Sequence, residues 1–222
     1  MLLILMVMKS LLGLLLLSTF FVNTIIAKDP ERNLKGFEVI YDGSDLSKLK
    51  TSGNWKIQDD GSLYLQPRDG ESGWTRYHHY LWLIEGYKDF VFEFEYKHLE
   101  AGNSGLYFRA SDEADPVNSG FEVQIMDSTG KADEEMGHHD LGGVIKTKGA
   151  SKNAGKPAGE WNLMKVTLKG THLKVVLNGI TVQDFDLAAE KPEDKDLAEE
   201  GLIAIQDHGL PFWVRNLRIK RL

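Results

Sequence analysis

The 222-residue sequence contains no cysteine. This absence excludes disulfide bonds, thiolate nucleophiles and cysteine-ligated zinc. It also excludes a lipid anchor on a cysteine behind an N-terminal leader. The HExxH motif, the phosphate-binding P-loop and the GxSxG motif are absent as well, so the sequence offers no case for a zinc protease, a nucleotide hydrolase or a serine hydrolase.

Positive charge is scarce relative to negative charge. The chain carries 26 Lys and Arg against 33 Asp and Glu, which gives a net charge of −7. Such a surface has no electrostatic footprint for nucleic acid or for an anionic membrane. The acidity is most simply interpreted as a contribution to solubility, and we expect no nucleic-acid partner.

The N-terminus has the pattern of a signal peptide. Lys9 precedes an apolar run over residues 11–17, and Ala27 is a small residue suited to the cleavage point. Because residues 1–8 are apolar and precede this lysine, we expect translation to start at Met8. The alternative is an uncleaved membrane anchor, since the apolar stretch counted from Met1 is long enough to span a bilayer.

These features predict a periplasmic or secreted protein with no membrane insertion once the leader is removed. The predicted organisation is a signal peptide over residues 1–27, a short N-terminal segment over 28–35 and a single domain over 36–222.

From residue 36 onward the hydrophobic pattern has a period of two, interrupted by turn residues every 8–12 positions, as is typical of an all-β sandwich or barrel. Asn178-Gly179 is a strong signal for a type I′ hairpin. The long excursion over residues 128–159 separates two strands, and loops of that length are often functional. The predicted strands lie at residues 55–57, 63–65, 90–96, 106–110, 121–125, 173–177, 180–182, 201–206 and 213–219.

Two of these strands carry polar residues opposite their core residues. Alternation sends Tyr107 and Arg109 to one side of the strand that follows Gly105, and it sends Glu122 and Gln124 to one side of the next. If the two strands are neighbours, these four side chains share one polar sheet face. His208 follows in a turn that ends at a glycine. Hydroxyl recognition and proton transfer need these residue types, so we interpret the face as carbohydrate-binding or carbohydrate-processing.

Other polar residues have simpler interpretations. Glu93 and Glu95 alternate with aromatic residues, as expected for the wet face of an antiparallel sheet. His138 and His139 are adjacent, so their rings point apart on an extended strand and cannot easily chelate one metal ion. We interpret this pair as part of a solvated loop and predict no metal ligands.

Several segments, in this order and spacing, resemble the 3-keto-disaccharide hydrolase domain family. The resemblance runs from about Gly36 to Leu222. Its markers are residues 102–110 (GNSGLYFRA), 120–127 (GFEVQIMD), 156–162 (KPAGEWN), 177–179 (LNG), 206–209 (QDHG) and 213–219 (WVRNLRI). The chain departs from the family pattern at Lys48-Leu49 and over residues 137–144, and both places bear on substrate preference.

This resemblance implies a concanavalin A-like jelly-roll β-sandwich of two antiparallel sheets. It also implies cleavage of the glycosidic bond of 3-keto-glycosides or 3-keto-disaccharides. We expect net hydrolysis by C2 proton abstraction, elimination and hydration. Our hypothesis assigns His208 as base or acid, Glu122 as orienter or second proton carrier, and Arg109 as oxyanion donor. The expected substrate-binding residues are Gln124, Tyr107, Asn103, Asp207 and Trp213.

Two alternatives stay open. One is a two-carboxylate glycosidase built on Glu93, Glu95 or Glu122. The other is a non-catalytic carbohydrate-binding module, in which the tryptophans would stack on sugars. We expect an oligosaccharide or glycoside as partner, a 3-dehydrogenase in the same pathway and no organic cofactor, and the sequence leaves the use of a divalent cation open. The tryptophans are Trp55, Trp74, Trp82, Trp161 and Trp213.

Overall fold

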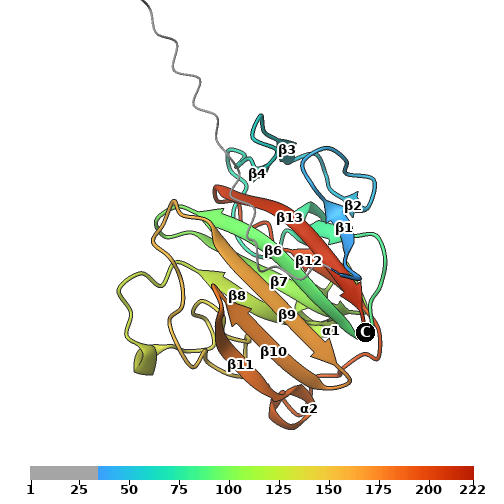
Figure 1. Cartoon of the computed structure of the whole chain (residues 1–222), viewed down its shortest axis with the longest axis vertical. Coiled ribbons are helices and arrows are strands. Elements are labelled where there is room, and N and C mark those ends of the chain that lie inside the picture. The colour runs from blue at the N-terminus through green and yellow to red at the C-terminus, as the bar shows by residue number, and fades with distance from the viewer. Residues whose placement is uncertain (1–34) are drawn as a thin grey trace, which may run out of the picture. The chain divides into compact units, whose positions relative to one another are not determined.

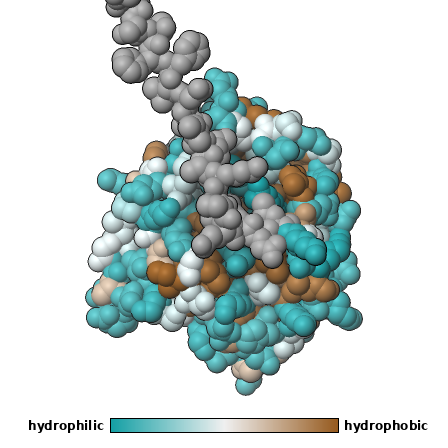
Figure 2. All heavy atoms as spheres, viewed as in Figure 1, coloured by the Kyte–Doolittle hydropathy of each residue, from teal (hydrophilic) through white to brown (hydrophobic). Residues whose placement is uncertain are grey.

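The computed structural model describes residues 35–222. The signal peptide, the start at Met8 and most of the short N-terminal segment lie outside the described residues. Within residues 35–222, no helix has both the length and the apolar character needed to cross a membrane. Hydrophilic residues cover most of the face of this domain that Figure 2 shows, with hydrophobic residues in separate patches.

Two antiparallel sheets make up the domain (Figure 1). The larger, which we call sheet A, has the strand order β11-β10-β9-β6-β13-β4-β3, with β1 paired to β13. The smaller, sheet B, has the order β2-β5-β12-β7-β8. Figure 1 draws β6, β9 and β10 in front of β7 and β8.

The elements have the following bounds. Sheet A contains β1 (Glu38–Tyr41), β3 (Trp55–Ile57), β4 (Leu63–Leu65), β6 (Phe90–His98), β9 (Asn162–Lys169), β10 (His172–Leu177), β11 (Ile180–Asp186) and β13 (Phe212–Arg221). Sheet B contains β2 (Leu49–Lys50), β5 (Leu81–Leu83), β7 (Asn103–Ala110), β8 (Phe121–Met126) and β12 (Leu202–Ile205). The short helices are η1 (Tyr77–His79), α1 (Pro116–Ser119), η2 (Asp133–Glu135) and α2 (Leu187–Glu190).

The core lies between the two sheets and is rich in aromatic rings. Phe90 of sheet A meets Phe108 of sheet B edge-on at 6.5 Å between ring centroids, and Phe108 stacks on Phe121 at 5.9 Å. All three side chains are buried. Each comes from a strand whose alternate residues point away from the core, which is how two packed sheets are expected to share an interior. The predicted all-β sandwich of two antiparallel sheets is confirmed.

The predicted hairpin between β10 and β11 is also confirmed. Asn178 and Gly179 have φ values of 50° and 85°, as the two central residues of a type I′ turn require. Leu177 pairs with Ile180 across the turn. The same holds for the shorter hairpin of β3 and β4, in which Trp55 pairs with Leu65.

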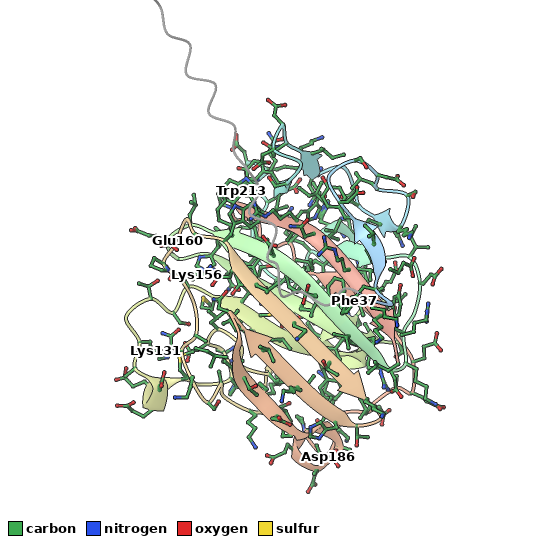
Figure 3. The ribbon with its side chains drawn as sticks, viewed as in Figure 1. Phe37, Lys131, Lys156, Glu160, Asp186 and Trp213 are labelled. Carbon is green, nitrogen blue, oxygen red and sulfur yellow. The ribbon has the colours of Figure 1, made fainter. Side chains whose placement is uncertain are left out.

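The excursion over residues 128–159 lies against the free edge of β8. Figure 3 marks its position at the side of the sandwich with Lys131. Gln124 of β8 donates its backbone N–H to the carbonyl of Gly143 and accepts at its own carbonyl from Gly142, with lengths of 2.8 and 2.9 Å. The excursion therefore extends sheet B beyond its last strand and gives the outer face of that sheet a side wall.

Candidate active site

The outer face of sheet B carries a cavity of about 310 Å³. Its floor comes from β7 and β8, and its walls come from the loop before η1, from α1, from the excursion and from the turn after β12. Cavities of this size that combine apolar walls with a few polar groups are typical ligand sites. The lining residues are Trp74, Asn103, Tyr107, Val117, Glu122, Gln124, Met126, His139, Ile145, Lys146, Gln206 and His208.

Glu122 provides the carboxyl group on the cavity floor. It pairs with Tyr107 across β7 and β8, and its Oε1 accepts a hydrogen bond of 3.0 Å from Nε2 of Gln206. Burial raises the pKa of this carboxyl to about 7, although a hydrogen bond with the Tyr107 hydroxyl and the charge of Lys195 oppose the rise. A carboxyl group with such a pKa can both accept and donate a proton near neutral pH.

Glycine at position 105 makes room for this carboxyl. Gly105 lies on β7 beside Glu122, and a Cβ atom there would come within 2.0 Å of Glu122 Oε1. Its carbonyl accepts from the backbone N–H of Gln206 at 2.8 Å. The glycine therefore lets the carboxyl lie flat over the strand while the strand stays bonded to the segment that follows β12.

Three side-chain amides line the same cavity as the carboxyl. Gln124 Nε2 donates to Asn103 Oδ1 at 3.2 Å, and Gln206 donates to Glu122 as described above. Each amide offers both a donor and an acceptor. Such a set suits the several hydroxyl groups of a sugar.

His208 lines the cavity from a turn that hydrogen bonds to the preceding Asp207 hold in place. The preceding Asp207 has no exposed surface, and its carboxylate accepts from Asn54 Nδ2 at 2.5 Å and from the Arg76 guanidinium at 3.2 Å. The backbone N–H of Gly209 completes the set at 2.7 Å. Burial lowers the pKa of the His208 imidazole, so the ring is mainly neutral at pH 7 and able to accept a proton.

An exposed indole stands at the mouth of the cavity. Trp74 is 49% exposed, and its backbone carbonyl accepts a 2.6 Å hydrogen bond from the Tyr80 hydroxyl. Burial raises the pKa values of the Tyr80 and Tyr107 hydroxyls far above the usual range. Both phenols therefore stay protonated, and they act as hydrogen-bond donors beside Glu122.

The excursion supplies a wall that the sequence did not predict. The backbone N–H of Ile145 donates to the Glu122 carbonyl at 3.0 Å, which brings Ile145, Lys146 and His139 to the cavity. We expected a solvated loop for His138 and His139. His139 is exposed but lines the cavity, whereas His138 accepts the Lys146 N–H at Nδ1.

The structure brings together Glu122, Gln124, Tyr107, Asn103 and His208. The neighbouring placement of β7 and β8, on which this grouping depended, is confirmed by their antiparallel register. Sequence reasoning missed several lining residues, most of which lie on loops or helix ends without periodicity. Met126 and Gln206 had a signal, since they lie in the family-like segments 120–127 and 206–209. Trp74 was expected only as one of the tryptophans that would stack on sugars in a binding module. The missed residues are Val117, Met126, His139, Ile145, Lys146 and Gln206.

Arg109 does not belong to this group, and its expected place on the polar face is wrong. Between the pairs Ala204–Tyr107 and Leu202–Ala110, β7 has one residue more than β12, and Arg109 has a φ of 53°. Such a bulge reverses the alternation of side chains. Ala110 therefore packs with Tyr107, and Arg109 points to the other side.

The buried guanidinium of Arg109 is fully engaged in holding the fold together. Its N–H groups donate to the carbonyls of Lys88, Ala198 and Gly170, and it forms an ion pair with Asp89 at 3.5 Å. Arg109 is thus unavailable as the oxyanion donor that the sequence analysis assigned.

Asp207 and Trp213 were expected to bind substrate, and the structure places both of them outside the cavity. Asp207 is completely buried behind His208, where it can position the turn but cannot touch a ligand. Trp213 lies on the outer face of sheet A, where it stacks on Tyr64 at 4.7 Å with Lys97 Nζ on the ring at 4.6 Å. Figure 3 shows Trp213 near one end of β13. Its position in a motif could not reveal on which sheet it would lie.

The carboxylates of β6 lie on the far side of the core from Glu122. Phe92 and Phe94 of β6 are buried in the core, so Glu93 and Glu95 face outward from sheet A. Glu95 accepts from Arg215 at 2.7 Å. The two-carboxylate alternative that would pair either residue with Glu122 is therefore not supported, because the sandwich separates them.

The arrangement of His, Asp and Glu side chains shows whether a metal ion could be held. Within residues 35–222, no three His, Asp or Glu side chains are grouped so that they could hold a metal ion. The cavity itself contributes Glu122, His139 and His208 as separate groups. We therefore derive no reaction step through a metal ion.

Comparisons with known proteins agree with this architecture. A 3-keto-disaccharide hydrolase of Bacteroides thetaiotaomicron strain VPI-5482 is 29% identical over 234 aligned residues, which cover 84% of this chain and 79% of that protein. A protein of Parabacteroides distasonis ATCC 8503, provisionally named a glycosyl hydrolase, has a TM-score of 0.69 at 22% identity, with 84% of this chain and 94% of that chain covered.

The carbohydrate-binding module CBM66 of Bacillus subtilis has a TM-score of 0.51 at 14% identity, with 85% of this chain and 97% of that chain covered. These structural likenesses show a shared jelly-roll fold. The model of the 3-keto-α-glucoside-1,2-lyase-like domain matches residues 36–220, which is almost the whole of the described chain. The resemblance inferred from the sequence motifs is confirmed, and the protein belongs to the family of 3-keto-α-glucoside-1,2-lyase-like domains.

Proposed function

We propose that this protein cleaves the glycosidic bond of 3-keto-glycosides by elimination followed by hydration, with net hydrolysis. The observation that supports this most directly is a buried carboxyl, Glu122, with a pKa of about 7 in the same cavity as the neutral imidazole of His208. An elimination needs a base that is free to accept a proton and an acid that still holds one, and these two groups can fill those roles.

The chemistry follows from the ketone. A carbonyl at C3 acidifies the hydrogen at C2, so a base can remove that proton and leave an enolate. The enolate then reforms the C3 carbonyl as the bond from C1 to the glycosidic oxygen breaks. We assign His208 as the base at C2 and Glu122 as the acid that protonates the leaving oxygen.

Hydration restores a sugar. Water adds its oxygen to C1 of the resulting enone, and a proton returns to C2. Glu122, now ionised, is placed to take the proton from this water, and protonated His208 delivers a proton to C2 after its N–H has exchanged with solvent. The sum is one 3-keto-glycoside and one water giving one 3-keto sugar and one alcohol. The amides of Asn103, Gln124 and Gln206 suit the hydroxyl groups of the ring.

Isotope incorporation tests the route. Purified protein is incubated in D₂O with 3-keto-trehalose, 3-keto-sucrose and a 3-keto-β-glucoside. Deuterium at C2 of the product is expected at early time, after correction for exchange in the absence of enzyme. A product that keeps its C2 hydrogen would point to direct displacement at C1 and contradict the proposal.

Matched histidine variants assign the base. His208→Ala is expected to lose turnover, whereas His172→Ala should not, because His172 lies on sheet A and pairs with Asp184 at 2.7 Å. Equal activity of both variants would remove His208 from the mechanism.

A carbohydrate-binding module is the second candidate function. The half-exposed indole of Trp74 at the cavity mouth favours it, because such a ring can stack on a sugar face. Glycan binding by the wild type, retained by His208→Ala and without turnover of any 3-keto-glycoside, would favour this alternative.

The setting of the reaction follows from the same chemistry. A 3-keto-glycoside arises when a dehydrogenase oxidises the hydroxyl at C3, so we propose that such an enzyme supplies the substrate. The leader-like pattern of residues 1–27 supports export to the periplasm or the medium. Fractionation of cells that express the full chain tests the location.

A further inference from the structure

The proposed elimination places negative charge on the C3 oxygen, and Arg109 cannot meet it. The guanidinium of Arg109 lies on the other side of sheet B and is engaged with backbone carbonyls. Oriented donors or cations at a developing oxyanion are usually among the largest contributions to catalysis. Another group of the cavity must therefore face this charge.

Lys146 is the one lysine or arginine among the residues that line the cavity. Within residues 35–222, its ammonium group has no ion-pair partner. Three other lysines of the excursion form salt bridges, namely Lys131–Asp140 at 2.6 Å, Lys148–Glu190 at 3.0 Å and Lys152–Asp133 at 3.7 Å. The fourth, Lys156, donates to the Trp161 carbonyl at 2.9 Å.

The backbone at Lys146 is held in a conformation that a lysine seldom adopts. Its φ is 57°, in the left-handed region that favours glycine. Hydrogen bonds close the turn, with Thr147 and Lys148 N–H groups donating to the Val144 carbonyl at 2.9 and 3.0 Å. The Lys146 N–H donates to His138 Nδ1 at 3.1 Å. Strain of this kind persists when surrounding contacts fix it, and it is common at functional sites.

The same turn is bonded to the backbone of Glu122, the residue that carries the cavity carboxyl. Because Ile145 N–H donates to the Glu122 carbonyl, Lys146 follows directly after a residue that is tied to Glu122. Burial lowers the pKa of a second lysine, Lys195; the charge of Lys146 adds to this effect, and the charge of Glu122 opposes it. This end of the cavity therefore combines positive charge with the carboxyl group.

We propose that the Lys146 ammonium group is the cationic partner of the enolate oxygen at C3, an assignment that rests on the proposed function. When the base takes the C2 proton, the electron pair of that C–H bond moves to the C3 oxygen beside Lys146. The charge returns to carbon as the carbonyl reforms and the glycosidic oxygen leaves. Lys146 keeps its own proton throughout.

Three variants test the assignment. Lys146→Met removes the charge, Lys146→Arg keeps it, and Lys152→Met removes a charge of the same excursion that does not line the cavity. We measure kcat, KM and the rate of deuterium uptake at C2 with the 3-keto-glycosides named above. Circular dichroism and thermal unfolding show whether each variant is folded.

We expect Lys146→Met to lower kcat and the rate of deuterium uptake by about 10²–10³-fold with little change in KM. Lys146→Arg should recover part of this loss, and Lys152→Met should match the wild type. A folded Lys146→Met protein within threefold of the wild type would overturn the assignment. A change in KM alone would also overturn it, since it would make Lys146 a ground-state binding residue. A wild type without turnover overturns the proposed function, and the role of Lys146 with it.

Discussion

The carboxyl of Glu122 lies against the bare backbone of Gly105, where a Cβ atom would come within 2.0 Å of Oε1. The contact joins two neighbouring strands, β7 and β8, which form the floor of the cavity. The position of the proposed acid is thus set by the absence of a side chain on the adjacent strand.

Gly105→Ala is expected to damage both activity and stability. The new methyl group must displace the buried carboxyl, which breaks the Gln206–Glu122 hydrogen bond. Overpacking of this kind costs about 1–3 kcal/mol, and we expect kcat to fall at least tenfold. Urea unfolding and steady-state kinetics measure the two effects.

Gly137→Ala is the control, because a Cβ there meets only Asp140 Oδ2, at 3.4 Å. It should leave both quantities nearly unchanged. Wild-type kinetics from Gly105→Ala would mean that Glu122 can work from another position.

The activity should follow a bell-shaped pH profile. The proposed mechanism needs neutral His208 and protonated Glu122. Burial lowers the pKa of His208 below its usual 6.5, so activity falls when acid protonates the ring. Burial raises the pKa of Glu122 to about 7, so activity falls again as base ionises the carboxyl. Measurement of kcat from pH 4.5 to 9 tests this, and an optimum above pH 8 would contradict the assignment of Glu122 as the acid.

Burial of Glu122 should also make stability depend on pH. The folded-state pKa of about 7 exceeds the ordinary value of 4.5, so its contribution to stability is fully present below pH 4.5 and is lost as the pH rises through 7. The loss is of the order of 3 kcal/mol.

Glu122→Gln keeps the shape of the side chain and removes the titration. We expect this variant to unfold at a higher temperature than the wild type at pH 8 and at nearly the same temperature at pH 4.5, while losing activity at both. Such an exchange of stability against activity is common at functional sites. An unfolding temperature that differs by the same amount at both pH values would show that folding does not change the pKa of Glu122.

Asp207→Asn is expected to act through His208. The substitution removes the charge that Arg76 meets at 3.2 Å, while Arg76 keeps its ion pair with Glu71 at 2.7 Å. Because one partner remains, the loss of stability should be smaller than that of a fully broken buried ion pair, which costs about 3–5 kcal/mol. The His208 turn then loses a fixed support, so kcat should fall more than KM changes. Asp59→Asn, at an exposed turn of sheet A, is the control. Unchanged unfolding of Asp207→Asn would show that the turn does not depend on this pair.

The polar floor of the cavity could be predicted because it depends on regular alternation. Phe121, Val123 and Ile125 define the core side of β8, which leaves Glu122 and Gln124 on the other side. The hairpin at Asn178 could be predicted as well, since the preference of Asn-Gly for a type I′ turn depends only on these two residues. Both inferences need only the geometry of one strand or one turn.

The cavity wall could not be predicted, because it depends on contacts between distant segments. His139 and Lys146 reach the site through the backbone pairing of the excursion with the edge of β8. No periodicity marks that pairing.

The bulge at Arg109 could not be predicted either. One extra residue in β7 leaves the hydrophobic pattern almost unchanged, but it reverses the direction of a side chain.

The Arg109→Met variant tests whether Arg109 takes part in catalysis or only stabilises the fold. The variant removes the charged donor from the part-buried hydrogen bonds to the carbonyls of Lys88, Ala198 and Gly170. A hydrogen bond to a charged group contributes about 1.5–3 kcal/mol, so the free energy of unfolding should fall by several kcal/mol. Because Arg109 does not line the cavity, the protein that remains folded at low temperature should keep KM and most of kcat. Loss of kcat by 10²-fold or more in a fully folded Arg109→Met protein would instead restore the oxyanion role to Arg109 and remove it from Lys146.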